Sequence, residues 1–284
     1  MIDGVPLVAL RCPLLSNLNL AFCNGITSLE GLDCPDLTRL DLSSCDGITD
    51  ASLAALQSFL LSNLDLSSCD GITDACVVAL HQFPLLSILN ISCCYGLTNA
   101  CLSALECPLL IKLNMSSCAC LTDARLMAHQ CPRLSSLDLS YCDFTSLTGL
   151  ECPNLIELIL SSCDGITDAS LVALHQFPLI SNLDLSYCDG LTNFTGFKCP
   201  QLTSLSLVGC SGLADSGLIA LDCINLSGLD LSNCDGITEA GLAGLQFPRL
   251  TTLNLSGCTG TTIPFNTKDA QEILRHAREA AERK

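Results

Sequence analysis

The sequence predicts an α/β solenoid, in which short repeats stack with a parallel β-sheet on one side and short helices on the other. A leucine pattern recurs eleven times at intervals of 21 to 25 residues, and turn and helix signals follow most of its copies. A unit this short has room for one strand and one return segment. It cannot bury its own apolar side chains, so neighbouring units must stack to form a continuous core.

The strand half of each unit reads Leu-x-x-Leu-x-Leu-x-x-Cys. Leu18 and Leu20 flank Asn19 and therefore point to the same side of a short strand. Each leucine that such a strand buries contributes about 1.5–3 kcal/mol. The pattern begins at Leu15, Leu37, Leu61, Leu86, Leu110, Leu134, Leu155, Ile180, Leu202, Leu226 and Leu250.

The return half is clearest from Asp164 to Leu174. Gly165 suits a turn that needs a positive φ. Thr167 or Asp168 can cap a short helix on the convex side. A Cys-Pro or Phe-Pro pair then ends most units, because proline stops a helix. The units after Cys23, Cys142 and Cys188 are shorter and are expected to return through turns or 3₁₀ segments.

The two ends differ. The array is expected to span residues 1–262 and to begin in mid-repeat, because Leu7–Leu10 aligns with Leu171–Leu174. Its N-terminal edge then has no polar cap, which makes self-association through that edge an expectation. Residues 263–284 are expected to form a capping helix that begins at Thr267, with an apolar stripe of Ala270, Ile273, Leu274 and Ala277.

The 22 cysteines fall into columns. Eleven close the strand pattern and are expected to point into the core as reduced thiols, and seven more share a position before the strand that Phe fills in other units. Reduced thiols indicate a reducing compartment, so the cytoplasm is expected, with the nucleus as an alternative. Cys93, Cys94, Cys118 and Cys120 could suggest zinc, but the ladder already uses two of them, so neither a metal nor a cofactor is expected.

Charge and motifs argue against several function classes. The net charge is −17, and the first 267 residues hold 25 acids against seven bases, which disfavours nucleic acid and suits either solubility or a basic partner. The uncharged stretch Ala75–Leu105 fits the repeat and contains Pro84, so no membrane span is expected. Phosphate-binding loops and nucleophile elbows are absent from the sequence, and we expect a protein without enzymatic activity.

One face of the predicted sheet carries the candidate binding residues. The column between the last two leucines is mostly Asp and Asn, including Asp138 and Asp184, and Ile159 interrupts it. Two columns along, serine predominates, and Phe22, Tyr141 and Tyr187 replace it. Tyr141, Ile159 and Tyr187 belong to three consecutive units and are expected to form one exposed apolar patch, because aromatic residues among small polar ones are typical binding anchors. These six residues are the predicted partner-binding site, with generic solvated surface and incidental aromatics as the alternatives.

The full pattern, Leu-x-x-Leu-x-Leu-Ser-x-Cys-x-x-Ile-Thr-Asp-x-x-Leu-x-x-Leu, resembles the cysteine-containing class of leucine-rich repeats over residues 2–260. That class forms the substrate-binding halves of F-box ubiquitin-ligase receptors, although this sequence contains no F-box. The resemblance implies a leucine-rich-repeat horseshoe whose partners bind the concave face.

Three functions remain open. The first is a non-enzymatic protein–protein interaction scaffold, and the second is the substrate-recognition part of an F-box ligase. The third is a structural or engineered array without a dedicated partner. The segment Ser67–Ala75 recurs unchanged at Ser161–Ala169, which suits recent duplication or consensus building, whereas the irregular unit lengths favour a natural origin.

Overall fold

The predicted stack of parallel strands is confirmed. A computed structural model describes residues 10–122, 125–126, 129–262 and 269–282. The chain divides into two compact units. The N-terminal unit comprises Met1–Cys142 and Gly149–Cys152, and the C-terminal unit comprises Asp143–Thr148 and Pro153–Lys284.

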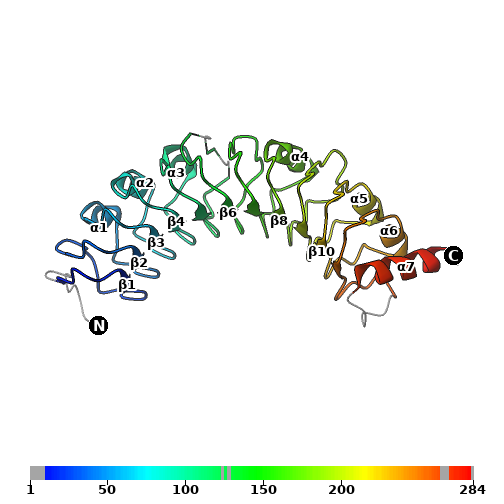
Figure 1. Cartoon of the computed structure of the whole chain (residues 1–284), viewed down its shortest axis with the longest axis horizontal. Coiled ribbons are helices and arrows are strands. Elements are labelled where there is room, and N and C mark those ends of the chain that lie inside the picture. The colour runs from blue at the N-terminus through cyan, green and yellow to red at the C-terminus, as the bar shows by residue number, and fades with distance from the viewer. Residues whose placement is uncertain (1–9, 123–124, 127–128, 263–268, 283–284) are drawn as a thin grey trace. The chain divides into compact units, whose positions relative to one another are not determined.

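The N-terminal unit holds six strands, and each pairs in parallel with the next along the chain. Short helices lie on the side of the strands away from their open face (Figure 1). The strands are β1 (Asn17–Asn19), β2 (Arg39–Asp41), β3 (Asn63–Asp65), β4 (Ile88–Asn90), β5 (Lys112–Asn114) and β6 (Ser136–Asp138). The helices are α1 (Asp50–Ala54), α2 (Ala75–Ala79), the 3₁₀ helix η1 (Leu80–Gln82) and α3 (Asn99–Ala104).

The C-terminal unit repeats this arrangement, with parallel neighbours from β7 to β11. Its strands are β7 (Glu157–Ile159), β8 (Asn182–Asp184), β9 (Ser204–Ser206), β10 (Gly228–Asp230) and β11 (Thr252–Asn254). Its helices are α4 (Asp168–Leu171), the 3₁₀ helix η2 (Val172–Gln176), α5 (Asp215–Ile219), α6 (Glu239–Ala243) and α7 (Ala270–Ala281).

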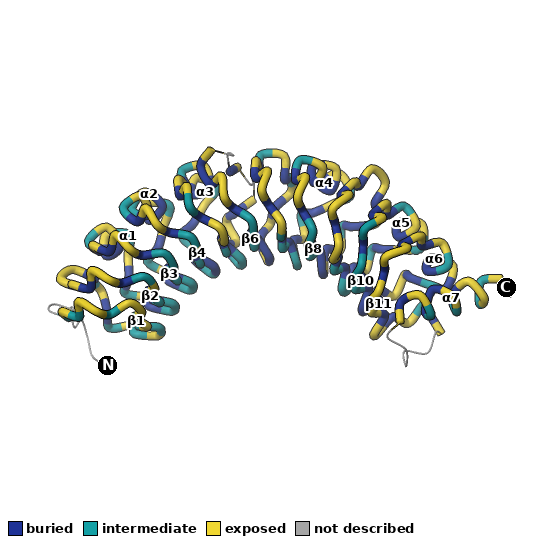
Figure 2. Tube along the Cα trace, in the orientation of Figure 1, coloured by how far each residue is buried: buried dark blue, intermediate teal, exposed yellow. Residues whose placement is uncertain are grey.

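The core of each unit lies between the strands and the helices, where the repeated leucines and cysteines are buried (Figure 2). Leu64 and Leu66 in one unit and Leu183 and Leu185 in the other are at most 3% exposed. The strands are in register, with the central leucines paired, as Leu183 is with Leu205. A single leucine position therefore sets the alignment of each repeat on the next.

The helix caps follow the sequence. Thr49 and Thr167 each form a capping box with the serine three residues later, and Thr98 accepts a hydrogen bond from the Ala100 amide. The short segments after Cys23, Cys142 and Cys188 contain turns and no helix, as expected. Each has three or four residues fewer than the longest unit, which leaves no room for a helical turn.

The expected positive φ at Gly165 is wrong. The left-handed residues lie instead just before the ladder cysteines, for example Ser162 at φ 55°. Gly165 is needed for a different reason: a Cβ there would lie 2.3 Å from the carbonyl oxygen of Phe144 in the preceding repeat. Only a residue without a side chain lets the two turns approach this closely.

At the C-terminal end, α7 packs on α6. Ala270, Ile273, Leu274 and Ala277 are all buried. Its N-cap is Asp269, whose side chain accepts hydrogen bonds from the amides of Gln271 and Glu272. The predicted cap, Thr267, and the segment Leu7–Ala9 lie outside the described residues.

Candidate functional site

The Asp and Asn column lies on the open strand face, opposite the helices, and its members close the turn that follows each strand. Oδ1 of Asp184 accepts hydrogen bonds from the amide of Ser186 at 2.9 Å and from its hydroxyl. Asp138 makes the same pair of contacts with Ser140. An Asx turn of this kind satisfies backbone donors that the strand leaves open. Both predicted binding carboxylates therefore have a structural task as well.

Amide side chains join this column across neighbouring strands. Nδ2 of Asn19 donates to Asp41 at 2.8 Å, Asn90 to Asp65 at 2.9 Å, and Asn254 to Asp230 at 3.0 Å. These pairs disperse the negative charge of three carboxylates. The mixture of Asp and Asn that the sequence shows in this column thus stabilises the stack of repeats.

The predicted aromatic residues lie in a special backbone position. Phe22, Tyr141 and Tyr187 have φ of 62°, 57° and 58° and are 78%, 61% and 50% exposed. Their column follows the Asp and Asn column by three residues, not two, and sits in the left-handed turn after the strand. Ser, Cys, Asn or Gly fills it in the other repeats. A large aromatic residue in this conformation is uncommon, because its Cβ crowds the backbone.

Tyr141 belongs to the N-terminal unit, whereas Ile159 and Tyr187 belong to the C-terminal unit. Within the latter, half-buried Ile159 pairs in register with Asp184. The ring of Tyr187 lies toward the opposite neighbour, because a Cβ on Gly209 would be 2.5 Å from two of its ring carbons. Tyr187 therefore covers the β9 repeat and not the β7 repeat that holds Ile159.

The β9 repeat departs from the others where Tyr187 covers it. Ser206 replaces Asp or Asn, Val208 replaces a small residue that is usually Ser, and Gly209 fills the left-handed position. The Tyr187 amide donates to the Val208 carbonyl at 2.6 Å, and the hydroxyls of Ser186 and Ser206 lie 2.7 Å apart. Ser206 and Gly209 are smaller than the residues usual at their positions, and Gly209 leaves room for the tyrosine ring beside the open face.

A groove of about 610 Å³ runs over β9, β10 and β11. Its lining includes Ser204, Ser206, Gly228, Asp230, Thr252 and Asn254. This groove is not among the features predicted from the sequence. The available signal was the run of Ser204, Gly228 and Thr252 at the first strand position, which larger residues such as Arg39, Ile88, Lys112 and Glu157 fill elsewhere.

The ladder cysteines are structural. Sγ of Cys69 donates to the Leu42 carbonyl at 3.1 Å, and Sγ of Cys188 donates to the Leu160 carbonyl at 3.2 Å. Burial raises the pKa of Cys69 to about 12 and that of Cys188 to about 11. Thiols held in this way remain protonated at neutral pH and are poor nucleophiles.

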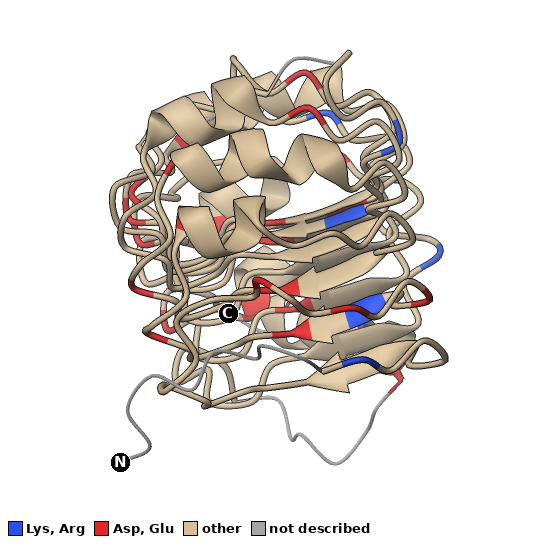
Figure 3. Ribbon diagram, turned by 90° about the vertical axis from the view of Figure 1, so that its left-hand side faces the viewer, with Lys and Arg blue, Asp and Glu red and all other residues tan. Residues whose placement is uncertain are grey.

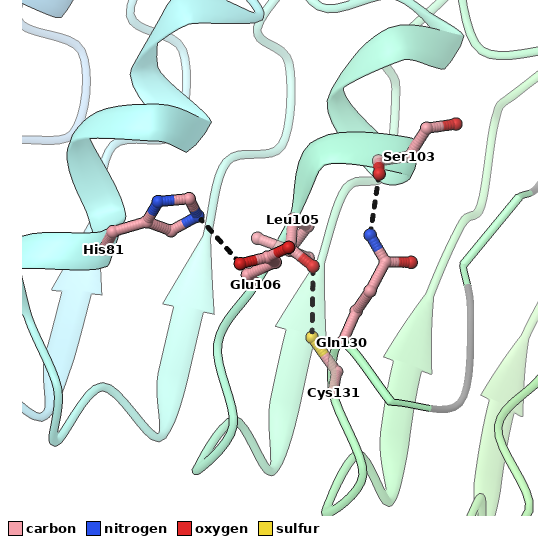
Figure 4. A network of polar contacts seen from close by, with 6 residues as sticks. All are labelled: His81, Ser103, Leu105, Glu106, Gln130 and Cys131. Atoms are coloured by element: carbon pink, nitrogen blue, oxygen red, sulfur yellow. Dashed lines mark hydrogen bonds and ion pairs between the residues drawn. The ribbon is translucent and has the colours of Figure 1, made fainter.

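The convex side carries polar contacts between repeats. Figure 4 shows the Gln130 side chain, which donates to the Ser103 carbonyl at 2.7 Å, near Cys131 and the pair of His81 and Glu106 at 4.0 Å. Gln82 and Gln176 make the equivalent contact with Leu53 and Leu147 at 2.8 Å. Gln82, Gln130 and Gln176, which follow His81, His129 and His175, therefore satisfy carbonyls of the preceding repeat.

The described residues show neither a cluster of metal ligands nor a helix suited to a membrane. No three His, Cys, Asp or Glu side chains in the described part of the chain gather closely enough to hold a metal ion. Among the helices that the structure describes, none has the length and apolarity that crossing a membrane requires. The chain has 29 acidic residues against 12 Lys and Arg, and Figure 3 marks where both kinds lie along the ribbon.

The repeats match a known family. Residues 33–56, 151–174 and 198–221 match the family described as Leucine Rich repeat. A search of the curated proteins gives no match. With the open-face geometry, these matches identify the fold as a leucine-rich-repeat solenoid, a fold that typically serves as a non-enzymatic scaffold for protein–protein interaction.

The chain is similar in fold to a solved structure. The TLR13–ssRNA13 complex contains a chain 19% identical to this one with a TM-score of 0.57, and the match covers 90% of this chain and 40% of that one. The mouse RP105/MD-1 complex contains a chain 18% identical to this one with a TM-score of 0.47, and the match covers 89% of this chain and 42% of that one. The yeast Rad7–Elc1 complex contains a chain 19% identical with a TM-score of 0.46, and the match covers 82% of this chain and 79% of that one. The chain thus spans about two fifths of the TLR13 and RP105 chains, and identities this low indicate the fold alone.

Proposed function

We propose that the protein is a non-enzymatic interaction scaffold whose C-terminal unit binds a protein partner on its open strand face, the face that the sequence analysis calls concave. Tyr187 carries the proposal. A non-glycine residue in the left-handed region costs on the order of 1–3 kcal/mol, and such strain concentrates at functional positions. Its ring is half exposed, although serine fills the same position in the β2, β3, β5 and β7 repeats.

The remaining predicted residues take supporting roles in the proposal. Ile159 and Asp184 pair in register on the same face, where an apolar side chain beside a carboxylate suits a mixed contact. In the N-terminal unit, Tyr141, Asp138 and Phe22 form a separate set of candidate contacts. Each unit is proposed to engage the partner through its own aromatic residues.

Affinity capture with mass spectrometry tests the proposal. Wild type is compared with Tyr187→Ser, which installs a residue that four other repeats hold in the same turn. The matched control is Tyr95→Ser, because Tyr95 is 61% exposed but lies one position after a ladder cysteine. We expect a partner that wild type and the Tyr95 variant retain and the Tyr187 variant loses.

Equal capture by all three proteins would contradict the role of Tyr187. The same measurement with Tyr141→Ser tests the N-terminal set independently. The absence of any specific partner in every sample would favour the third function, an array without a dedicated partner. Size-exclusion chromatography of the same samples tests self-association.

The ubiquitin-ligase function is a second proposal that rests on the family resemblance. The hydrogen bonds from the cysteine Sγ atoms to backbone carbonyls support this resemblance, because they give the recurrent cysteines one shared structural role. A cysteine-containing class of repeats requires such a role. Ligase subunits among the captured proteins would favour this function. Their absence beside a retained partner would favour a scaffold of another kind. Free buried thiols also support the expected cytoplasmic or nuclear location.

A further inference from the structure

Three adjacent strands form a notch on the open face of the C-terminal unit. Ser206 pairs in register with Asp184 on one side and with Asp230 on the other. Neighbouring strands are about 4.8 Å apart, so the two aspartates stand roughly 10 Å from each other across the small serine. No other described repeat places a residue as small as serine between two aspartates of this column.

Small side chains lead from Ser206 into the neighbouring groove over β9, β10 and β11. Ser204 and Gly228 occupy the position two residues earlier on β9 and β10, and they line the groove with Ser206. At the other end, the ring of Tyr187 lies over Gly209. In the notch, the hydroxyl of Ser206 therefore lies between the carboxylates of Asp184 and Asp230, and the ring of Tyr187 lies at one end.

The strands of this face are acidic. Of the residues in β7–β11, all of which the structure describes, Glu157, Asp184 and Asp230 are acidic and none is Lys or Arg. Asn254 donates to the second carboxylate oxygen of Asp230, whereas Asp184 uses only Oδ1, in its turn. A partner that covers this face must supply positive charge, because an unpaired buried carboxylate is costly.

We propose that the partner presents an extended segment whose arginine or lysine side chain enters over Ser206, between Asp184 and Asp230, with its stem against Tyr187. The planar guanidinium of arginine donates from two edges and suits carboxylates on opposite sides better than the compact ammonium of lysine. An aromatic ring at the rim adds a cation–π contact. This inference rests on the proposed function and specifies the chemistry of its partner.

Panning a random-peptide display library on the whole chain tests the proposal. Three proteins are compared: wild type, the double variant Asp184→Asn/Asp230→Asn, and the control Asp41→Asn/Asp65→Asn in the N-terminal unit. Asparagine preserves the Asx turn, since Asn90 and Asn114 accept the same backbone hydrogen bond in their own repeats. The substitutions therefore remove charge and keep the turn. The control also loses the acceptors of Asn19 and Asn90, so it matches the loss of the acceptor of Asn254 in the Asp184/Asp230 variant.

We expect peptides selected on wild type to share an arginine or lysine. Their affinity should fall about tenfold or more in the Asp184/Asp230 variant, remain unchanged in the control, and weaken as salt rises. Selected peptides without a shared basic residue, or equal affinity for all three proteins, would overturn the proposal, as would a selection that yields no peptide.

The outcome separates this inference from the proposed function. A captured partner that Tyr187→Ser loses but Asp184→Asn/Asp230→Asn retains would leave the scaffold function standing and overturn the cationic contact. A partner that both variants retain would overturn both.

Discussion

Ser58 occupies the pre-strand column that cysteine or phenylalanine fills in the other repeats. Its side chain is 2% exposed, and its hydroxyl has no hydrogen-bond partner. A buried hydroxyl without a partner costs about 1–3 kcal/mol, and a thiol costs less because it is less strongly hydrated. We predict that Ser58→Cys raises the free energy of unfolding by about 1 kcal/mol.

Urea unfolding monitored by circular dichroism measures the Ser58 effect. The reverse change, Cys107→Ser, is the matched control because Cys107 is buried in the same column, and it should lower the stability. A midpoint that falls in Ser58→Cys would contradict the explanation.

The close approach at Gly165 gives a second prediction. Gly165→Ala should destabilise the C-terminal unit by about 1–3 kcal/mol, because the new methyl group meets a backbone carbonyl that cannot move aside. Gly228→Ala is the control: its Cβ would lie 3.1 Å from the Thr252 hydroxyl, the end of a side chain that can rotate. Thermal unfolding of both variants should show the loss in Gly165→Ala alone.

Asp168 joins two repeats and makes stability depend on pH. Burial acts to raise its pKa, but hydrogen bonds from the Thr192 side chain and from the amides of Asn193 and Thr192 outweigh it, so the pKa lies below its usual range. A carboxyl group with a lowered folded pKa stabilises the fold above its unfolded pKa of about 4, and this contribution is lost as the pH falls through the folded value.

We therefore predict that Asp168→Asn flattens the loss of stability below about pH 4. The fold should persist, because Asn99 accepts the equivalent hydrogen bond from the Thr122 amide at 2.9 Å. Urea midpoints measured from pH 7 to pH 3 provide the test. A fall in the urea midpoint below pH 4 identical to that of wild type would show that Asp168 does not contribute to the pH dependence of stability.

At the scale of elements, the strand half of each unit was predictable from sequence and the turn chemistry was not. The leucine period fixes the strands because every copy must bury the same face, as Leu183 and Leu205 do. The positive φ was assigned to Gly165 because glycine favours it, yet Ser162 adopts it. The stacking of repeats determines which residue adopts the positive φ. The sequence of one repeat does not show where the backbone carbonyls of the neighbouring repeat lie.

Helix α7 covers the last repeat with buried apolar side chains. Leu274 is 1% exposed, and Gln271 donates to the carbonyls of Phe247 and Leu250 at 3.2 and 3.0 Å. We predict that Leu274→Ala costs about 2–5 kcal/mol and increases hydrogen exchange in β11 more than in β8. Arg275→Ala, at an exposed position, should leave exchange unchanged. Equal exchange in the two strands of the Leu274 variant would show that α7 does not protect the end.

At the scale of the whole molecule, the patch of Tyr141, Ile159 and Tyr187 stays a prediction that rests on their consecutive repeats. The order of the repeats does not specify which neighbour a side chain covers, and the ring of Tyr187 lies over Gly209. The groove depends on several small residues at once, and its volume follows from the packing of three strands, which no single column of the alignment reveals.

The cysteines give a prediction that involves every repeat. Of the 22 thiols, Cys120 is exposed and Cys12, Cys23 and Cys93 are partly exposed, which leaves 18 buried. Burial raises the pKa of Cys118 to about 12 and that of Cys234 to about 11, so these thiols are both inaccessible and protonated at pH 8.

A disulfide reagent such as DTNB should therefore react quickly with the four exposed or partly exposed thiols, and the other 18 should react only after unfolding. Cys120→Ser should reduce the fast group to three, and urea should release all 22 in wild type. A fast group much larger than four would mean that the repeats open locally, and the cysteine ladder would then be too loose to hold the stack in register.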